Sequence, residues 1–502
     1  MRIVFRGVLP TLALAVAVSV VLSASTSSSA RSEVQLELGD LLVEDERYWE
    51  AIPVFTRAKE GGTAEQIERA SAGLLQALLV VAEFNQAFKE ARFLQGLHSE
   101  DPERRALYGD GLWSYGLFEE AEAVYQDILA EWPSSAGARH GFARSLAAQG
   151  RLDDALNEIR TALAAAPERA EFYHTLGSIQ RRMKRFGDAA DSFDEFVGRL
   201  RPSRRAAKAG WARSQARFLR SFGDREPVDI QGPEDVVHTV PFTLDGDKVV
   251  VQAYINEEGP YDLVVDTGAE QMVLSQETAQ EVGVRPLVTT ISAGVGDVGV
   301  RGLDLGRADS LRIGTLEVSN LPAIIKNPPL TGLPESRVKD SMSPLAFGLS
   351  TKIDYRNKSL VMATRLPYEP ADIELPMRVH RLAVVRGVVN GEHPKSFVID
   401  TGGEVISISL GTANAIDTVP PRRIPLRVFG TSGWDADAFL LPGVRLAFSE
   451  IEYDNLSVVV LNLHRPSALL GFHIGGIIGH RFLSEYVVSI DMQRSMLRLN
   501  RY

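Results

Sequence analysis

Two aspartates stand in matching surroundings and could together perform acid–base chemistry. Each ends a run of three apolar residues, and each opens a turn, as Asp266-Thr267-Gly268 and as Asp400-Thr401-Gly402. Glycine in such a turn permits an unusual backbone dihedral and lets another chain segment approach closely. An acidic residue at the end of a buried strand has surroundings of low dielectric constant, so both carboxyl groups are candidates for catalysis.

The chemistry depends on whether the two turns meet. If they face each other across a pseudo-twofold axis, Asp266 and Asp400 cannot both ionise cheaply, and they share one proton. The ionised member then acts as general base on a water, while the protonated member hydrogen-bonds a carbonyl, so an amide is hydrolysed without a covalent intermediate. Two solvated turns in a duplicated β domain are the alternative, because Asp, Thr and Gly are all turn formers.

A second pair of matching segments supports a duplication. The triplets are 134 residues apart, and Ile353-Asp354 and Ile490-Asp491 are 137 residues apart. From Val236 onward the chain is rich in Val, Ile, Thr, Gly and Pro, which indicates strands in a closed or sandwiched, mainly-β fold. We therefore expect two β lobes, residues 236–370 and 375–502.

A helical region precedes these lobes. Residues 33–220 are rich in Ala, Leu, Glu and Arg, with apolar residues at helical spacing. A small residue recurs at intervals of 36, 34, 34 and 34, at Ala51, Ala87, Ala121, Ala155 and Ala189. A period of 34 is typical of tetratricopeptide (TPR) hairpins, so about five all-α repeats are expected to stack into a solenoid. A plain helical bundle is the alternative, and residues 221–235 are expected to form a linker.

The N-terminus has the pattern of an export signal. Residues 1–30 contain an early basic residue, Arg2, then an apolar run from Val8 to Leu22 and small residues ending at Ala30. We expect cleavage near Ala30 and a periplasmic or secreted protein. An uncleaved membrane anchor is the alternative, because the apolar run is only slightly shorter than a spanning helix.

Composition excludes several classes of partner and site. The net charge of −11 opposes binding to nucleic acid, and the absence of cysteine excludes disulfides and thiolate chemistry. His473 and His480 are expected to be surface or capping residues, since no acidic residue lies between them. We expect neither a metal nor another cofactor.

The triplets and one further segment resemble the retroviral-type (retropepsin-like) aspartic peptidases, specifically bacterial exported forms with two lobes in one chain. The resemblance covers roughly residues 236–501 and includes Gly476–Leu483, which looks like the apolar-apolar-Gly element that supports the active-site turn. It implies that Thr267 and Thr401 hydrogen-bond across the pseudo-twofold axis. It also implies mobile flaps over the substrate, for which the candidate residues are Gly294, Gly296, Gly430, Gly433 and Trp434.

The first lobe departs from the family pattern. In place of an apolar-apolar-Gly element it has Asp340–Phe347, with Ser341 and Ser343 at positions that normally serve packing and close approach. We therefore expect Asp266 to be less firmly positioned than Asp400. Gly403, where the family more often has Ala, Ser or Thr, is a smaller departure.

The leading hypothesis is an aspartic endopeptidase whose repeats bind protein substrates or a partner, on the concave face that such arrays present. A second hypothesis is a non-catalytic TPR scaffold with a degenerate, peptide-binding protease domain. A third keeps the chemistry but pairs each lobe with its copy in another chain.

Overall fold

The computed structural model describes residues 28–200, 208–233, 235–292, 295, 301–326, 340–416, 423–430 and 433–502. Residues 1–27 of the predicted signal segment lie outside this range. The chain forms two compact units, Met1–Glu100 and Asp101–Tyr502. Within the described ranges, no helix is long and apolar enough to cross a membrane.

The first unit consists of helical hairpins. Its helices are α2 (Ser28–Glu44), α3 (Tyr48–Ala58), α4 (Ala64–Val80) and α5 (Phe84–Gly96), and each packs against the next. Thr63 caps α4 through a reciprocal capping box with Gln66, which satisfies amide groups that have no partner within the helix. Ser28 to Ala30, the expected end of the signal segment, lie in the first turn of α2.

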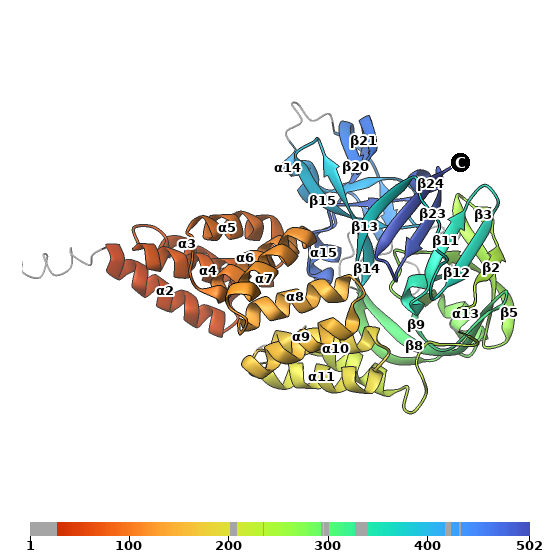
Figure 1. Cartoon of the computed structure of the whole chain (residues 1–502), viewed down its shortest axis with the longest axis horizontal. Coiled ribbons are helices and arrows are strands. Elements are labelled where there is room, and N and C mark those ends of the chain that lie inside the picture. The colour runs from red at the N-terminus through yellow and green to blue at the C-terminus, as the bar shows by residue number, and fades with distance from the viewer. Residues whose placement is uncertain are drawn as a thin grey trace, which may run out of the picture. The chain divides into compact units, whose positions relative to one another are not determined.

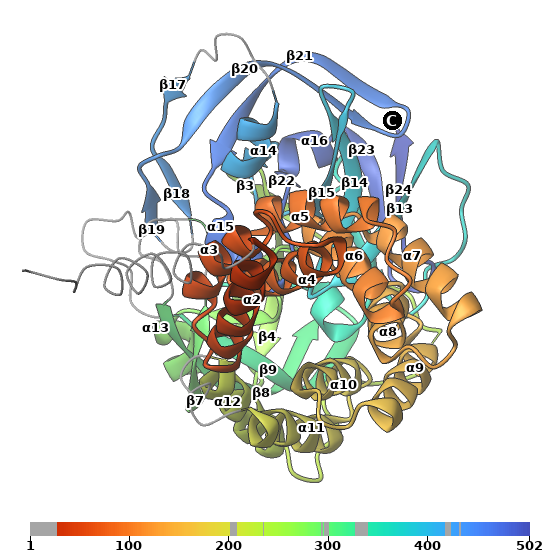
Figure 2. The ribbon, with the colours of Figure 1, turned by 90° about the vertical axis from the view of Figure 1, so that its left-hand side faces the viewer.

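The second unit begins with further hairpins. Its helices are α6 (Pro102–Tyr115), α7 (Phe118–Glu131), α8 (Ala136–Ala148), α9 (Leu152–Ala165), α10 (Ala170–Arg182), α11 (Phe186–Arg199) and α12 (Lys208–Arg220). Each helix packs against its successor, and α8 also contacts α6 and α10. Figure 2 shows α6 to α12 following one another in an arc. This stacking is that of a repeat solenoid rather than of a plain bundle.

The 34-residue period has a geometric cause. The five recurring alanines lie in the second helices of their hairpins, and all are wholly buried. Five positions before each alanine, the turn residue has a positive φ, at Glu46, Ala82, Gly116, Gly150 and Lys184. In four of the five repeats a larger side chain four residues after the alanine fills the next layer, at Phe55, Tyr125, Ile159 and Phe193. Tyr125 leaves so little room that a Cβ at Gly109 would lie 2.5 Å from its ring. The period thus reflects a left-handed turn residue and a small residue in every repeat, with a larger residue in most of them.

The first β lobe surrounds Asp266. Its elements are β1 (Asp229–Ile230), β2 (His238–Pro241), β3 (Thr243–Asp245), β4 (Lys248–Ile255), β5 (Glu258–Val265), β6 (Met272–Leu274), α13 (Gln276–Glu281), β7 (Pro286–Ser292), β8 (Arg301–Ile313), β9 (Leu316–Ile325), β10 (Ser341–Met342), η3 (Pro344–Phe347), β11 (Ser350–Asp354) and β12 (Ser359–Ala363). The main sheet has the order β1-β9-β6-β10-β5-β4-β8-β7. Since β1 pairs with β9, and Phe222 and Val228 are buried, the segment expected to be a linker is packed onto this lobe.

The second lobe repeats this arrangement around Asp400. Its elements are β13 (Ile373–His380), β14 (Leu382–Val389), β15 (His393–Ile399), β16 (Ser407–Ser409), α14 (Leu410–Ala415), β17 (Ile424–Pro425), β18 (Val428–Gly430), β19 (Gly433–Asp435), β20 (Phe439–Phe448), β21 (Ile451–Leu461), α15 (His464–Leu470), β22 (Gly476–Ile478), α16 (His480–Leu483), β23 (Tyr486–Asp491) and β24 (Met496–Arg501). The mainly-β character and the duplication expected from the sequence are both confirmed (Figure 1).

Six strands form a sheet that both lobes share, in the order β13-β24-β23-β11-β12-β2. The repeated Ile-Asp segments end β11 and β23, and Ile353 lies opposite Val488. Each aspartate caps the turn that follows, since Asp354 accepts the Asn357 amide at 2.9 Å and Asp491 accepts the Arg494 amide at 3.0 Å. The two anchors therefore have the same structural role.

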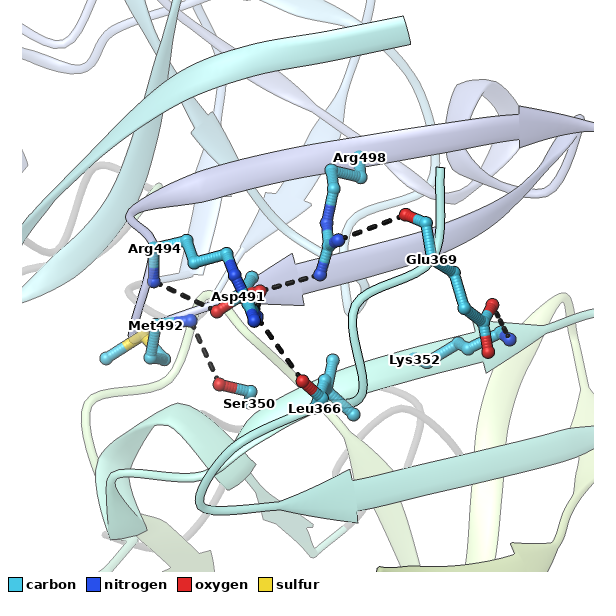
Figure 3. A network of polar contacts seen from close by, with 8 residues as sticks. All are labelled: Ser350, Lys352, Leu366, Glu369, Asp491, Met492, Arg494 and Arg498. Carbon is cyan, nitrogen blue, oxygen red and sulfur yellow. Dashed lines mark hydrogen bonds and ion pairs between the residues drawn. The ribbon is translucent and has the colours of Figure 1, made fainter. Parts of the chain in front are cut away.

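A buried polar network strengthens this sheet (Figure 3). Asp491 is wholly buried and pairs with Arg498 at 2.6 Å and Arg494 at 2.8 Å. The amide of Met492 donates to Ser350 Oγ at 3.0 Å, which links the second lobe to the first. A buried charge without a partner is costly, and the two arginines offset that cost for Asp491.

The repeats of the second unit dock on the lobes through their hairpin turns. Ser396 Oγ donates to Gly116 O at 2.6 Å, Ser495 Oγ to Gln149 O at 2.6 Å, and Lys184 Nζ to Val228 O at 2.7 Å. These three turns are the ones that contain the left-handed residues. The docking contacts therefore recur with the period of the repeat.

Candidate active site

Each of the two aspartates directly follows a strand that pairs in parallel with a second, supporting strand. In the first lobe, β5 pairs with β10, and the Asp266 amide donates to Met342 O at 2.9 Å. In the second lobe, β15 pairs with β22, and the Asp400 amide donates to Ile478 O at 3.0 Å. The first lobe thus forms the supporting strand even where its sequence departs from the family pattern.

Two threonines lock the turns together. Thr267 Oγ1 donates to Ile399 O at 2.7 Å, and Thr401 Oγ1 donates to Val265 O at 2.6 Å. Each threonine hydroxyl also accepts the other threonine's amide, both at 3.1 Å. Both side chains are buried, so these four bonds fix the relative position of the two turns.

The same geometry brings the two carboxyl groups close enough to interact electrostatically. A Cβ on Gly268 would lie 2.7 Å from Asp400 Cγ, and one on Gly402 would lie 2.6 Å from Asp266 Cγ. Asp266 accepts the Gly268 amide and Asp400 accepts the Gly402 amide, both at 2.9 Å. Glycine is therefore required at both positions by close approach.

The pair has perturbed acidity. Burial raises the pKa of Asp400, and the charge of Asp266 raises it further, to about 7. Burial also raises the pKa of Asp266, although its hydrogen bonds with Asp400 and the Gly268 amide, and the charges of Lys248 and Lys326, oppose this. The pair therefore keeps one shared proton to a higher pH than an isolated aspartate would.

Comparison with known families agrees with this geometry. Residues 251–333, which include Asp266, match the family described as "gag-polyprotein putative aspartyl protease", and residues 112–179 match tetratricopeptide repeats. The chain therefore contains one segment similar to TPR repeats and one similar to a gag-like aspartyl protease domain. No curated protein matches it.

Solved structures resemble its two parts separately. A TPR protein from Thermus thermophilus is 20% identical, with a TM-score of 0.30, and the match covers 34% of this chain and 91% of that one. An aspartic proteinase from Irpex lacteus is 10% identical, with a TM-score of 0.35, and the match covers 53% of this chain and 97% of that one.

The turns of the protease domain differ in their backbone support. In the second lobe, the His480 amide donates to Gly403 O at 2.8 Å and the Arg481 amide to Glu404 O at 3.0 Å. Gly479 permits this, because a Cβ there would lie 2.7 Å from Val405 N. In the first lobe, Ser343, Pro344 and Leu345 stand where the second lobe has Gly479, His480 and Arg481, and proline has no amide hydrogen to donate. The departure seen in the sequence is therefore real at Ser343 and Pro344.

The second departure, at Gly403, suits the site. The Gly403 amide donates to Asp400 at 2.9 Å, beside the bond from Gly402. A Cβ on Gly403 would lie 2.9 Å from Asp400 Oδ2, so glycine leaves room for the carboxylate.

The sequence analysis did not predict the role of one further acidic residue of the first lobe, Asp340. Asp340 accepts the Ser275 amide and the Thr278 hydroxyl, both at 2.5 Å. In the second lobe a backbone carbonyl, Gly475 O, accepts the corresponding bonds from Ser409 and Thr412, both at 2.9 Å. The repeated Ser-x-x-Thr pattern, at the same 134-residue offset as the triplets, is the signal that could have revealed this equivalence.

The candidate flap residues are described only in part. Gly294 and Gly296 lie outside the described residues, but Val295 lies against Gly430, where a Cβ would clash with it. Gly430 and Gly433 end the hairpin strands β18 and β19, and Trp434 is 44% exposed. Val295 and Gly430, one from each segment expected to form a flap, are therefore in contact.

The histidines are not surface residues, in contrast to the sequence expectation. Both are buried; His473 contacts Ser409 Oγ at 3.1 Å, and His480 packs edge-on against Tyr355 with ring centroids 5.0 Å apart. Burial lowers the pKa of both, to about 3 for His473. Among the described residues, no group of three or more potential ligands could hold a metal ion.

Proposed function

We propose that the chain is an aspartic endopeptidase, in which Asp266 and Asp400 activate the water that hydrolyses the peptide bonds of the substrate. The observation that carries the proposal is the reciprocal bonding of Thr267 and Thr401, which holds two carboxyl groups in contact within one chain. Pairing with another copy is then unnecessary for catalysis.

The two aspartates have different roles in this proposal. Asp400 retains the proton and hydrogen-bonds the scissile carbonyl, since its pKa is raised to about 7. Asp266 is the ionised member of the pair and removes a proton from the attacking water. The water oxygen adds to the carbonyl carbon, and the amine leaves after it is protonated.

Activity against a mixed peptide library tests the proposal. We expect cleavage that a statine-type transition-state mimic blocks and that Asp266→Asn and Asp400→Asn each abolish. Asp309→Asn and Asp454→Asn are matched controls, because these side chains are 74% and 76% exposed, far more than the paired carboxyls. Retained cleavage in either active-site variant contradicts the mechanism, whereas no cleavage by the parent protein favours the non-catalytic scaffold.

The repeats are proposed to bind a protein substrate or partner on their concave face. The charge of −11 disfavours nucleic acid as that partner. Replacement of exposed residues on the first helices of the repeats is expected to raise KM for a protein substrate but not for a short peptide. An equal effect on both substrates contradicts this role.

Export to the periplasm or medium is proposed from residues 1–30 alone. Cell fractionation and N-terminal sequencing test it, with a new terminus near Ala30 expected. An intact terminus in the membrane fraction identifies an uncleaved anchor, and an intact terminus in the cytoplasm contradicts export.

A further inference from the structure

A cavity of about 140 Å³ lies over one face of the sheet that both lobes share. Four of its lining residues are Val361, Lys352, Ser489 and Arg498, which come from β12, β11, β23 and β24. Lys352 lies opposite both Val361 and Ser489, and Ser489 lies opposite Arg498, so the four form one row across adjacent strands. Residues in such a row point to the same face. The cavity therefore touches two strands of each lobe.

The connection between the lobes, residues 364–372, covers the cavity. It contributes Leu366 and Glu369 to the lining. Arg498 Nη1 donates to Glu369 O at 3.2 Å, and Arg494 Nη1 donates to Leu366 O at 3.3 Å (Figure 3). The cover is thus held in place by the two arginines of the buried network.

The lining combines apolar and cationic side chains. Its apolar members are Val237, Val361, Leu366 and Pro367. Its cations are Lys352 and Arg498, and Glu369 is its acidic member. Arg494 and Asp491 adjoin them, and the network of these five charged side chains has one positive charge in excess. Such a lining suits an anion that also has an apolar part.

Arg498 retains donors for such an anion. Only 4% of its side chain is exposed. A guanidinium has five N–H donors, and among the described residues Arg498 uses one for Asp491 Oδ2 at 2.6 Å and one for Glu369 O at 3.2 Å. Its Nε is buried and has no partner in the same part of the chain. Because an unsatisfied buried donor is costly, this side chain favours a further acceptor.

Lys352 can exchange its present partner for a ligand. Its Nζ donates to Glu369 Oε2 at 2.6 Å, but 56% of the Glu369 side chain is exposed. An ion pair with an exposed partner contributes little to stability, because water solvates the separated charges well. A carboxylate in the cavity can therefore take the place of Glu369 beside Lys352 at little cost.

We propose that this cavity binds a short aliphatic carboxylate, with its oxygens on Lys352 and Arg498 and its hydrocarbon chain against Val361 and Leu366. A cavity of about 150 Å³ holds benzene, so a ligand of about six non-hydrogen atoms fits, and butyrate has this size. The ligand bridges strands of both lobes and so stabilises their junction. The site is separate from the active-site turns, which contribute none of the lining residues.

The first test uses butyrate on the full chain, with butan-1-ol and butylammonium as neutral and oppositely charged probes of the same length. A ligand that binds only the folded state raises the melting temperature. At constant ionic strength we expect a saturable rise with millimolar butyrate and no comparable rise with the other two probes. No rise with butyrate, or an equal rise with butylammonium, overturns the proposal.

Inorganic phosphate tests the role of the hydrocarbon chain. It has the negative charge but cannot contact the apolar lining as butyrate can, so we expect it to bind at least tenfold more weakly. Equal affinity for phosphate overturns the assignment of an aliphatic ligand.

Two substitutions should change the affinity for butyrate in opposite directions. Lys352→Met removes a cation and leaves Glu369 unpaired beside the cavity, so a dissociation constant at least tenfold higher is expected. Glu369→Gln removes the carboxylate that competes for Lys352, and should lower the dissociation constant severalfold. Lys358→Met, at an exposed lysine in the turn between β11 and β12, is the control and should change nothing. General destabilisation cannot produce opposite changes, so weaker binding in both cavity variants overturns the proposal.

The position of the ligand is tested by NMR of protein with ¹³C-labelled valine and leucine methyl groups. Butyrate should shift the signals of Val361 and Leu366, and it should leave the signal of Val54 in α3 unchanged. Shifts that exclude Val361 and Leu366 place the ligand elsewhere and overturn the assignment. Neither this measurement nor the melting temperature requires peptide cleavage, so the proposal can fail or stand independently of the proposed peptidase function.

Discussion

Thr267 and Thr401 bond to each other in both directions across the boundary between the lobes. Each amide donates to the other's hydroxyl at 3.1 Å, and each hydroxyl donates to the carbonyl of the residue that precedes the opposite aspartate. The arrangement is symmetric, although the surrounding turns are supported in different ways. The carboxyl groups are therefore positioned by an element that both lobes supply equally.

Replacement of either threonine by valine should impair catalysis more than folding. Thr267→Val leaves the Thr401 amide and Ile399 O without their partners, which costs about 1–3 kcal/mol for each buried group. A displacement of about 1 Å at the dyad lowers the rate by about 10²-fold. Steady-state kinetics and thermal unfolding measure the two effects. Thr267→Ser keeps the hydroxyl and should retain most activity, and equal loss in both variants would contradict the role of these bonds.

Close approach at the dyad makes Gly268 sensitive to the smallest substitution. In Gly268→Ala the new Cβ would lie 2.7 Å from Asp400 Cγ, so we expect activity to fall at least 100-fold. Gly187→Ala is a suitable control, because a Cβ there meets nothing within 4 Å and alanine favours a helix by about 0.5–1 kcal/mol. Peptide cleavage by an otherwise stable Gly268→Ala protein at the parent rate would show that the turns are less constrained than this geometry requires.

The pKa of Asp400 is raised, whereas that of an ordinary ion-paired aspartate is lowered. The two groups should therefore change the stability of the fold with pH in opposite directions. The folded state binds the proton more tightly than the unfolded state, so this group stabilises the fold at low pH and the contribution is lost as pH rises from about 4 to about 7. Asp400→Asn should remove that dependence. Thermal unfolding of both proteins from pH 4 to 8 measures it, and a parent whose melting temperature rises steadily relative to Asp400→Asn across this interval would contradict the assignment.

The rate of peptide cleavage should depend on the same proton. Activity is expected to decline as pH rises through about 7, because Asp400 then loses the hydrogen that it donates to the substrate carbonyl. On the acid side, activity should decline as Asp266 becomes protonated. A pH profile of kcat/KM measures both limbs. A rate that still rises above pH 8 would exclude a shared-proton pair.

The features that the sequence predicted are those that repeat within it. The alanines recur because every hairpin has the same close contact, and the Asp-Thr-Gly triplets recur because each lobe contributes half of one site. The unpredicted features depend on contacts between unlike segments. Nothing near Glu270 in the chain identifies Arg381 of the other lobe as its ion-pair partner. Asp340 replaces a backbone carbonyl, so only the repeated Ser-x-x-Thr pattern of its partners could have indicated its role. The buried His473 was misjudged for the same reason, since its burial depends on contacts with distant residues such as Tyr115.

The docking of the repeats on the lobes gives a final prediction, at Gly116. Its φ is +89°, and an added Cβ would lie 2.8 Å from Ser396 Oγ, the atom that bonds Gly116 O. A left-handed conformation costs an ordinary residue roughly 1–2 kcal/mol, and the clash adds to this cost. Gly116→Ala should therefore lower the melting temperature and expose the junction of the repeats with the second lobe to proteolysis. Gly150→Ala is the matched control, because it has a similar φ of +78° but its Cβ would meet Met492 O at 3.4 Å. The smaller destabilisation expected there reflects backbone strain alone, and equal effects of the two substitutions would mean that the contact with Ser396 contributes nothing.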